Sequence, residues 1–496
     1  MNSTTFKSLS VFNKWFPTSL FNHPVSINST RQYVQKFSKE VAFALLDNET
    51  VSGVASPALI SYFTITFIAV LLIVIGSYAT IEKPANAIDP NPNHPLFDQS
   101  DKDRTLVPDA TIGATTAIAM PMVAGFGLVG LYFMIQRIDK EKLARFLSSY
   151  LLIVGYSADS FSLGFLYKVI SRKLAQLTGL SSLDFNQRYT LTIAKDSAIH
   201  PAGAEPEMLL PEATDQERIL KEEALLAARD PIPAEDQLVN LYFTKGDLYG
   251  HVCSVIFTLG LSVLDYSNNW LLSNVAGSVF AIYGVAKCRI TSFKVAVALL
   301  VLFFAYDIYF VFGTDVMVAV ATNVDIPVKL MIPNSASRAT DTVSLSLLGL
   351  GDIVLPGSVI ALCLRFDLYN FHDAHPRTEF HHLQRYSKPY FISALVCYSI
   401  GLAATIAAVY SFSQGQPALL YLSPSLIVSI LVTASARGEL KKVWSYQEEP
   451  DESKEKDIEV DILCSKDTLY LAGEIDSNDE DDDQDLDYVP EESAEE

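Results

Sequence analysis

Long hydrophobic runs recur along most of this chain, and they constrain its fold more than any other feature. Half of the 496 residues are apolar. Runs of about 18 or more apolar residues match the thickness of a bilayer when they form helices. We therefore predict an all-α, polytopic membrane protein with about nine transmembrane helices. The expected spans are residues 57–80, 113–135, 146–167, 249–266, 269–286, 292–313, 343–365, 389–412 and 417–436.

The distribution of basic residues predicts which way the chain crosses the membrane. With nine spans, the side of the C-terminus holds 25 Lys and Arg residues, counting Lys294 and Arg365 at the ends of their spans, against 11 on the side of the N-terminus. The positive-inside rule then places the C-terminus in the cytosol. All three Asn-x-Ser/Thr sequons lie in the N-terminal tail, as expected for a tail that faces a secretory lumen and carries glycans. They are Asn2, Asn28 and Asn48.

These spans divide the chain into four parts. Residues 1–56 form the expected luminal tail, and residues 57–247 hold the first three spans with a polar cytosolic loop at about 171–247. Residues 248–440 hold the remaining six spans. From Glu448 onward there are 22 acidic residues and 3 lysines, which explains most of the net charge of −21. We expect residues 441–496 to be an acidic, disordered cytosolic tail, and so acidic a surface argues against nucleic acid as a partner.

Two aspartates lie inside segments that otherwise favour the membrane interior. Asp307 lies in the sixth expected span and Asp352 in the seventh. If the sixth span ends near Gly313 and the seventh begins near Val343, the rise per residue puts Asp307 roughly 9 Å and Asp352 roughly 14 Å below the same membrane face. Adjacent antiparallel helices would bring them together. Such a pair shares a proton, with one member as base and the other as acid, and suits the activation of water against a peptide bond. The carboxylates alone fit a proton or ion transporter equally well.

The remaining reactive side chains give no metal or disulfide pattern. The five cysteines show neither metal-ligand spacing nor a disulfide framework. Four histidines, His372, His375, His381 and His382, cluster after the seventh span, but their spacing fits no zinc site. We predict no metal and no cofactor.

Three motifs separate protease from transporter. Tyr306-Asp307, Gly349-Leu350-Gly351-Asp352 and Pro417-Ala418-Leu419 together resemble the signature of the intramembrane aspartyl proteases, which include the presenilins. Within that superfamily the stretches YDIYFVFGTDVMVAVA, LGLGDIVLPG and QPALLYLSPS look like the signal peptide peptidase family. The strong resemblance covers residues 290–440. Presenilins have a longer loop between the catalytic spans, and signal-peptide-peptidase-like proteins often have a larger luminal domain.

The resemblance implies a role for each motif residue. Asp307 and Asp352 would be the catalytic pair, on the sixth and seventh helices. The other motif residues would bind substrate or shape the active site: Tyr306, Gly349, Leu350, Gly351, Gln416, Pro417, Ala418 and Leu419. The two glycines lack side chains and would let an extended substrate approach Asp352. Close helix packing explains them equally well, and Tyr306 is either a hydrogen-bond donor near the pair or an ordinary aromatic of the bundle.

The resemblance also predicts substrates, partners and location. The substrates would be transmembrane peptides, above all remnant signal peptides and other membrane helices of type II orientation. The protein would lie in the endoplasmic reticulum membrane or another secretory or vacuolar membrane, as a homo-oligomer or with quality-control partners. The chain ends Ser-Ala-Glu-Glu, without a dilysine retrieval signal. A non-catalytic scaffold for protein quality control is the third alternative, beside protease and transporter.

Overall fold

The chain divides into two units, and almost all of the described residues belong to the first. A computed structural model separates Met1–Tyr446 from Gln447–Glu496. The described residues are 27–46, 57–88, 111–179, 185–194, 237–264, 269–314, 316, 329–337, 342–412 and 416–448. Asn2, Asn48 and almost all of the acidic tail lie outside these ranges.

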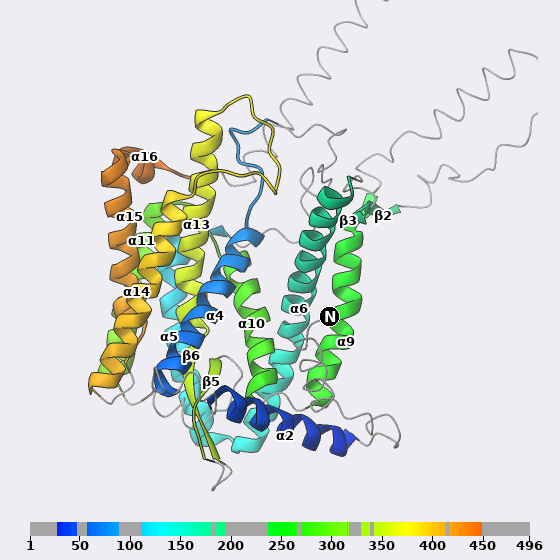
Figure 1. Ribbon diagram of the computed structural model, residues 1–496, viewed down its shortest axis with the longest axis vertical. Helices are drawn as coiled ribbons and strands as arrows, with labels where there is room; N and C mark the ends of the chain where they lie inside the picture. Colours follow the sequence, from blue (N-terminus) through cyan, green and yellow to red (C-terminus); the bar gives the residue numbers. More distant parts are fainter. Residues whose placement is uncertain are drawn as a thin grey trace, which may run out of the picture. The chain divides into compact units, whose positions relative to one another are not determined.

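Helices dominate the described part of the first unit (Figure 1). Each of the nine expected spans falls on one helix. They are α4 (Pro57–Ala79), α5 (Ala114–Arg137), α6 (Lys140–Thr178), α9 (Lys245–Val263), α10 (Trp270–Lys287), α11 (Phe293–Phe312), α13 (Gly351–Ala374), α14 (Pro389–Phe412) and α15 (Leu419–Arg437). Two further helices, α2 (Ile27–Leu46) and α16 (Leu440–Ser445), precede and follow them. Among the described residues, six helices are long and apolar enough to cross a membrane: α4, α5, α9, α11, α14 and α15.

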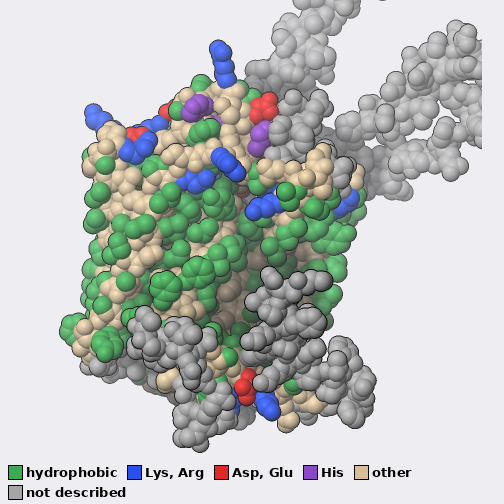
Figure 2. All heavy atoms as spheres, viewed as in Figure 1, with side chains coloured by type: hydrophobic (Ala, Val, Ile, Leu, Met, Phe, Trp, Pro, Cys, Tyr) green, Lys and Arg blue, Asp and Glu red, His purple; other side chains and the backbone are tan. Residues whose placement is uncertain are grey.

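The helices expose large apolar side chains on their outer faces. Phe63 on α4 is 75% exposed and Phe126 on α5 is 79% exposed. Figure 2 shows hydrophobic side chains along the sides of the bundle, whereas Lys, Arg and His gather at the end where α16 and the C-terminal end of α13 lie. Contiguous apolar surface of this kind is the expected surface of helices that face lipid.

Three short two-stranded sheets connect the helices. β1 (Thr111–Ile112) pairs in parallel with β4 (Arg289–Ile290). β2 (Arg188–Ala194) pairs antiparallel with β3 (Gln237–Thr244), inside the expected 171–247 loop. β5 (Lys329–Ser337) pairs antiparallel with β6 (Thr342–Gly349), between the two helices that carry Asp307 and Asp352. None of these strands was expected from the sequence.

The β5–β6 hairpin corrects the expected start of the seventh span. We predicted a helix over 343–365, but residues 342–349 form a strand and the helix begins at Gly351. The reason is pairing: β6 forms its ladder with β5, which the apolar composition of the segment did not reveal. Asp352 therefore lies in the first turn of its helix, and the depth estimate that assumed a helix from Val343 does not hold.

Small residues let three helices meet at the centre of the bundle. Val285 on α10 contacts both Gly76 on α4 and Gly357 on α13, where an added Cβ would come within 2.7 Å of the valine in each case. Only glycine permits so close an approach. This contact fixes α13, and with it Asp352, against α4 and α10.

Candidate active site

Asp307 lies near the C-terminal end of α11. This helix begins after Ser292, whose hydroxyl accepts a hydrogen bond from the backbone N–H of Val295, and then runs through an almost entirely apolar sequence. Asp307 is only 8% exposed, and its carboxylate faces inward from α11. A carboxylate buried in such surroundings requires a partner.

Asp352 is the partner of Asp307. It occupies the first turn of α13, and the two carboxylates are close enough for their charges to interact. The structure thus brings together the two residues that the sequence singled out. Two neighbouring carboxyl groups at low dielectric cannot both ionise comfortably, so the pair is suited to hold one proton between them.

The N-terminus of α15 supplies a hydrogen-bond donor to the pair. The backbone N–H of Leu419 donates to the carboxylate of Asp307. The first N–H groups of a helix have no partner within the helix, and Leu419 opens α15 immediately after Pro417 and Ala418. Pro417, Ala418 and Leu419 are all buried. The three-residue motif therefore sets the start of α15 at the place where the backbone N–H of its first residue reaches Asp307.

Two helix N-termini consequently converge on the two carboxylates. Asp352 lies in the first turn of α13, and Asp307 accepts from the first residue of α15. The positive ends of both helix dipoles favour negative charge at this place. The arrangement can hold one ionised carboxylate beside one protonated carboxyl group, which is what acid–base attack by water requires.

The two glycines before Asp352 differ in their surroundings. A Cβ added at Gly349 would lie 3.2 Å from Oδ2 of Asp352, whereas a Cβ at Gly351 would meet nothing within 4 Å. Gly349 therefore leaves room for the carboxylate itself, and Gly351 borders open space. Leu350 between them is buried and packs near Gly277 of α10, which anchors the start of α13.

The remaining motif residues have structural surroundings. The ring of Tyr306 packs on Phe310 with centroids 4.6 Å apart, and both rings lie over Gly125 of α5. Within the described residues its hydroxyl makes no hydrogen bond to the pair, so the geometry favours aromatic packing. Gln416 is half-buried at the start of the segment that leads into α15.

Tyr398 is a residue near the site that sequence reasoning missed. It lies on α14 and is fully buried, and its hydroxyl donates to the main-chain oxygen of Asp352 at 3.3 Å. The contact ties α14 to the first turn of α13. No motif marks this tyrosine, because only the packing of α14 against α13 brings it to Asp352.

Two buried aspartates were also missed at the level of sequence. Asp159 on α6 accepts a hydrogen bond from the hydroxyl of Thr258 on α9 at 2.7 Å. Asp367 on α13 accepts the backbone N–H groups of Tyr390 and Phe391, at 3.3 Å and 2.9 Å. Asp159 could have been found as a third carboxylate inside the expected span 146–167.

The sequence also drew attention to three sequons and to a cluster of four histidines. Asn28 lies in the first turn of α2, and Asn2 and Asn48 lie outside the described residues. Of the four clustered histidines, His372 is buried on α13 and the other three follow that helix. Within the described ranges no three His, Cys, Asp or Glu side chains are grouped so that they could hold a metal ion.

Comparison with known proteins decides the family. The model of the signal peptide peptidase family matches residues 104–450, well over half of the chain. The chain belongs to the signal peptide peptidase family. A probable intramembrane protease of Saccharomyces cerevisiae is 32% identical over 445 residues, which cover 80% of this chain and 75% of the yeast protein. The signal peptide peptidase of Mus musculus is 28% identical over 345 residues, 68% of this chain and 74% of its own length. No solved structure gives a significant match.

Membership of the signal peptide peptidase family establishes the class of activity. Its members are intramembrane aspartic proteases, and this chain is therefore a multi-pass membrane hydrolase. The transporter and scaffold alternatives are not favoured. The matched region includes α5 to α16 and with them both aspartates of the site.

Proposed function

We propose that Asp307 and Asp352 are the catalytic pair of this protease. The observation that carries the proposal is the proximity of the two carboxyl groups at the N-termini of α13 and α15. The N–H of Leu419 stabilises a negative charge on Asp307, so Asp307 is assigned as the base. It removes a proton from a water molecule that attacks the scissile carbonyl carbon. Asp352, as the protonated acid, gives its proton to the leaving nitrogen as the C–N bond breaks.

A transmembrane substrate must first lose its helical structure at the scissile bond. Every amide within a spanning helix is hydrogen-bonded internally, so its carbonyl carbons are shielded until the helix unwinds. An unwound segment exposes N–H and C=O groups that need new partners inside the membrane. A site for such a substrate should therefore offer backbone partners beside the catalytic pair.

The outer edge of β6 offers such partners. On the other strand of the hairpin, the side chain of Asn274 bonds both the N–H and the C=O of Met331, at 2.7 Å and 2.6 Å. Ser61 also donates to the main-chain oxygen of Pro333. The outer edge of β5 is thus occupied by side chains from α10 and α4.

The register then identifies the groups on the open edge. Because the backbone of Met331 points away from β6, its partner Leu347 points its own N–H and C=O away from β5. The same holds two residues later for Gly349, which pairs with Lys329. We infer that an extended substrate adds to β6 along Leu347 and Gly349, which lead directly to Asp352.

A proline at position 347 tests this mode of binding. Leu347→Pro removes an outward N–H without removing a ladder bond to β5, and proline is tolerated on an open edge. We expect the protein to fold and KM for a peptide substrate to rise roughly tenfold, the worth of one hydrogen bond. The control is Leu347→Ala, which keeps the N–H. An equal rise in KM for both variants would assign the effect to the leucine side chain and overturn the strand model.

Remnant signal peptides and other type II membrane helices are the proposed substrates, in the endoplasmic reticulum membrane. This proposal rests on the named relatives, the 25 to 11 distribution of basic residues and the three N-terminal sequons. It requires a luminal N-terminus and a cytosolic C-terminus. Glycans on at least one sequon, and protease access to a tag after Glu496 outside sealed microsomes, would support it; a protected tag would reverse the orientation.

A transition-state-like inhibitor tests the catalytic pair directly. A peptide mimic with a hydroxyl at the scissile position imitates the tetrahedral intermediate and binds tightly only where two carboxyl groups flank one oxygen. A photolabelled form should crosslink to the wild type and lose labelling in Asp307→Asn and in Asp352→Asn. Asp159→Asn is the matched control, since it neutralises another buried aspartate, and should label fully. Pro417→Ala should weaken labelling less than either aspartate change. Unchanged labelling of both catalytic variants would refute the assignment.

A further inference from the structure

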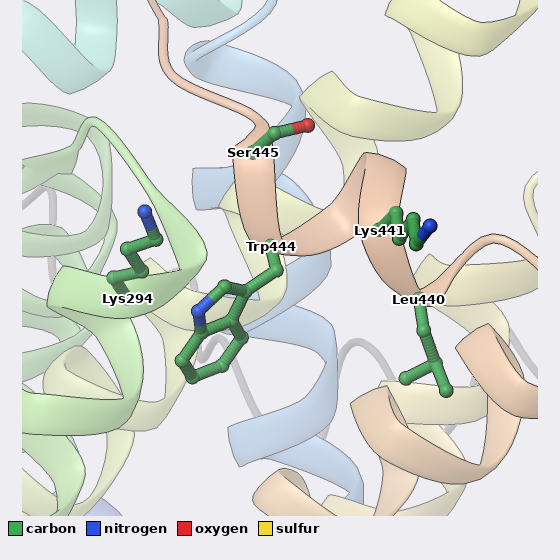
Figure 3. Close-up of a pocket in the computed structure, with 5 residues that line it drawn as sticks. All are labelled: Lys294, Leu440, Lys441, Trp444 and Ser445. Carbon is green, nitrogen blue, oxygen red and sulfur yellow. The ribbon is translucent and has the colours of Figure 1, made fainter.

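An open pocket lies where α16 crosses the beginning of α11. The chain leaves α15 through Gly438, whose φ of 67° is readily adopted only by glycine, and α16 follows directly. The pocket has a volume of about 420 Å³. Its lining residues are Lys294, Leu440, Lys441, Trp444 and Ser445 (Figure 3).

Several contacts hold α16 in place. Val443 is buried against the bundle, and Lys442 forms an ion pair with Asp373 at 2.6 Å. Glu439, just before the helix, accepts hydrogen bonds from Tyr390 and Arg437, both at 2.9 Å. Burial works to raise the pKa of Glu439, but the hydrogen bonds from Arg437 and Tyr390 outweigh it and hold that pKa below its ordinary value. Asp373 and Glu439 are therefore already paired.

The two lysines of the pocket differ from Lys442. Within the described part of the chain, neither Lys294 nor Lys441 forms a hydrogen bond or an ion pair. The pocket consequently carries two positive charges that its own walls do not neutralise. A negatively charged ligand would supply the missing charge.

The position of the pocket indicates where that ligand comes from. Lys294 lies in the first turn of the membrane-spanning α11, and α16 begins shortly after the membrane-spanning α15 ends. Leu440 is 46% exposed and Trp444 is 50% exposed. Figure 3 shows these two side chains extending from α16 in the same direction, with Lys294 beyond the indole ring. Trp at the headgroup level and Lys beside it are typical of the boundary between lipid and water.

We propose that this pocket binds the headgroup of an anionic phospholipid. Lys294 and Lys441, which Figure 3 shows on opposite sides of Trp444, supply the positive charge that attracts the headgroup, and Leu440 and Trp444 lie against the glycerol region and the first part of an acyl chain. The combination of uncompensated charge with exposed apolar side chains fits a lipid better than a soluble anion, because a soluble anion has no apolar part to contact Leu440 and Trp444. This lipid site is separate from the catalytic pair and independent of the proposed roles of Asp307 and Asp352.

Fluorescence of Trp444 tests the proposal in the full-length protein. The chain has three tryptophans, so Trp15→Phe with Trp270→Phe leaves Trp444 as the reporter. The protein is placed in nanodiscs of phosphatidylcholine with a fixed minor fraction of phosphatidylserine. Bromine atoms, which quench indole fluorescence on contact, are carried either by the phosphatidylserine or by an equal fraction of the phosphatidylcholine.

The brominated phosphatidylserine should quench Trp444 more strongly than the same fraction of brominated phosphatidylcholine. Lys294→Gln and Lys441→Gln should each reduce this preference roughly fivefold, as expected for one lysine at an anionic surface. Lys173→Gln, at an exposed lysine near the end of α6, is the control and should leave the preference unchanged. Equal quenching by the two lipids, or a preference that survives the double lysine variant, would overturn the proposal.

Two further measurements distinguish a lipid at this pocket from a lipid bound elsewhere and from a soluble anion. Trp270→Phe removes the hydrogen bond that Trp270 donates to Ser38. The single-tryptophan protein and the wild type are therefore both crosslinked with a photoactivatable phosphatidylserine and compared. Crosslinks should map to residues 438–446 and to the start of α11; crosslinks only elsewhere would refute the site. Inorganic phosphate added in excess should not reverse the quenching. Full reversal would identify the site as one for a soluble anion.

Discussion

Asp352 and Asp367 lie on the same helix, yet their surroundings assign them opposite tasks. Asp367 is 2% exposed and accepts two backbone N–H groups from the first turn of α14. Asp352 instead faces the carboxylate of Asp307. Both positions draw on the positive end of a helix. The carboxylate near Asp367 is Glu439, which is already bonded to Arg437 and Tyr390. Within the described residues, by contrast, no cation is among the charges that act on Asp352. Burial of an aspartate inside a membrane bundle is therefore compatible with a structural role, and the proposed catalytic role of Asp352 rests on the carboxylate of Asp307 beside it.

The sharpest test of this comparison is the loss of proteolysis at the pair. Asp307→Asn and Asp352→Asn should each reduce cleavage of a synthetic signal peptide by roughly 10²- to 10⁴-fold or more, because each removes half of the acid–base chemistry. Folding should survive, since a neutral amide is less unfavourable to bury than an ion. Mass spectrometry of the products in detergent measures the first effect and thermal unfolding the second. Retained cleavage in either well-folded variant would contradict the assignment.

Asp367→Asn should show the reverse pattern. An amide at this position can accept only one of the two N–H groups of α14 and leaves the other unsatisfied. We expect the free energy of unfolding to fall by about 1–3 kcal/mol while turnover per folded molecule stays unchanged. Denaturation in detergent, with activity normalised to folded protein, gives both quantities. A loss of turnover without a loss of stability would place Asp367 in the chemistry.

Gly349→Ala should impair catalysis where Gly351→Ala does not. The new methyl at position 349 would lie 3.2 Å from the Asp352 carboxylate and displace it by a few tenths of an ångström. Because a 1 Å misplacement reduces rate by about 10²-fold, we expect kcat to fall roughly tenfold. Gly351→Ala meets nothing within 4 Å and should stabilise the helix slightly. If Gly351→Ala raises KM with kcat unchanged, the substrate occupies that open space.

The smallest expected effect is that of Tyr398→Phe. It removes one hydrogen bond to the main chain of Asp352 and keeps the buried ring on α14. We expect a loss of about 0.5–1.5 kcal/mol in stability and a decrease of kcat with KM unchanged. Tyr410→Phe, on the exposed face of the same helix, is the control. Equal kcat in the two variants would show that Tyr398 has no part in positioning Asp352.

The sequence by itself determined the class of fold and supplied the two residues that we propose as the catalytic pair. Hydrophobic runs of spanning length located nine of the long helices, because in lipid the backbone must satisfy its own hydrogen bonds. They did not locate α2, which lies in the expected N-terminal tail. The high free energy of an ionised carboxylate in such a run identified Asp307 and Asp352. Their local motifs then indicated the family, which the comparisons confirmed.

Only the tertiary structure decided how these residues meet. Strand β6 of the β5–β6 hairpin replaces the expected first turns of the seventh span. Strand pairing depends on a second segment, and the hydrophobic pattern of residues 342–349 does not reveal which segment that is. Three contacts join residues from different helices. Leu419 donates to Asp307, Tyr398 donates to the main chain of Asp352, and the start of α14 donates to Asp367. An apolar helix can face its neighbours in many ways, and packing between helices selects one of them.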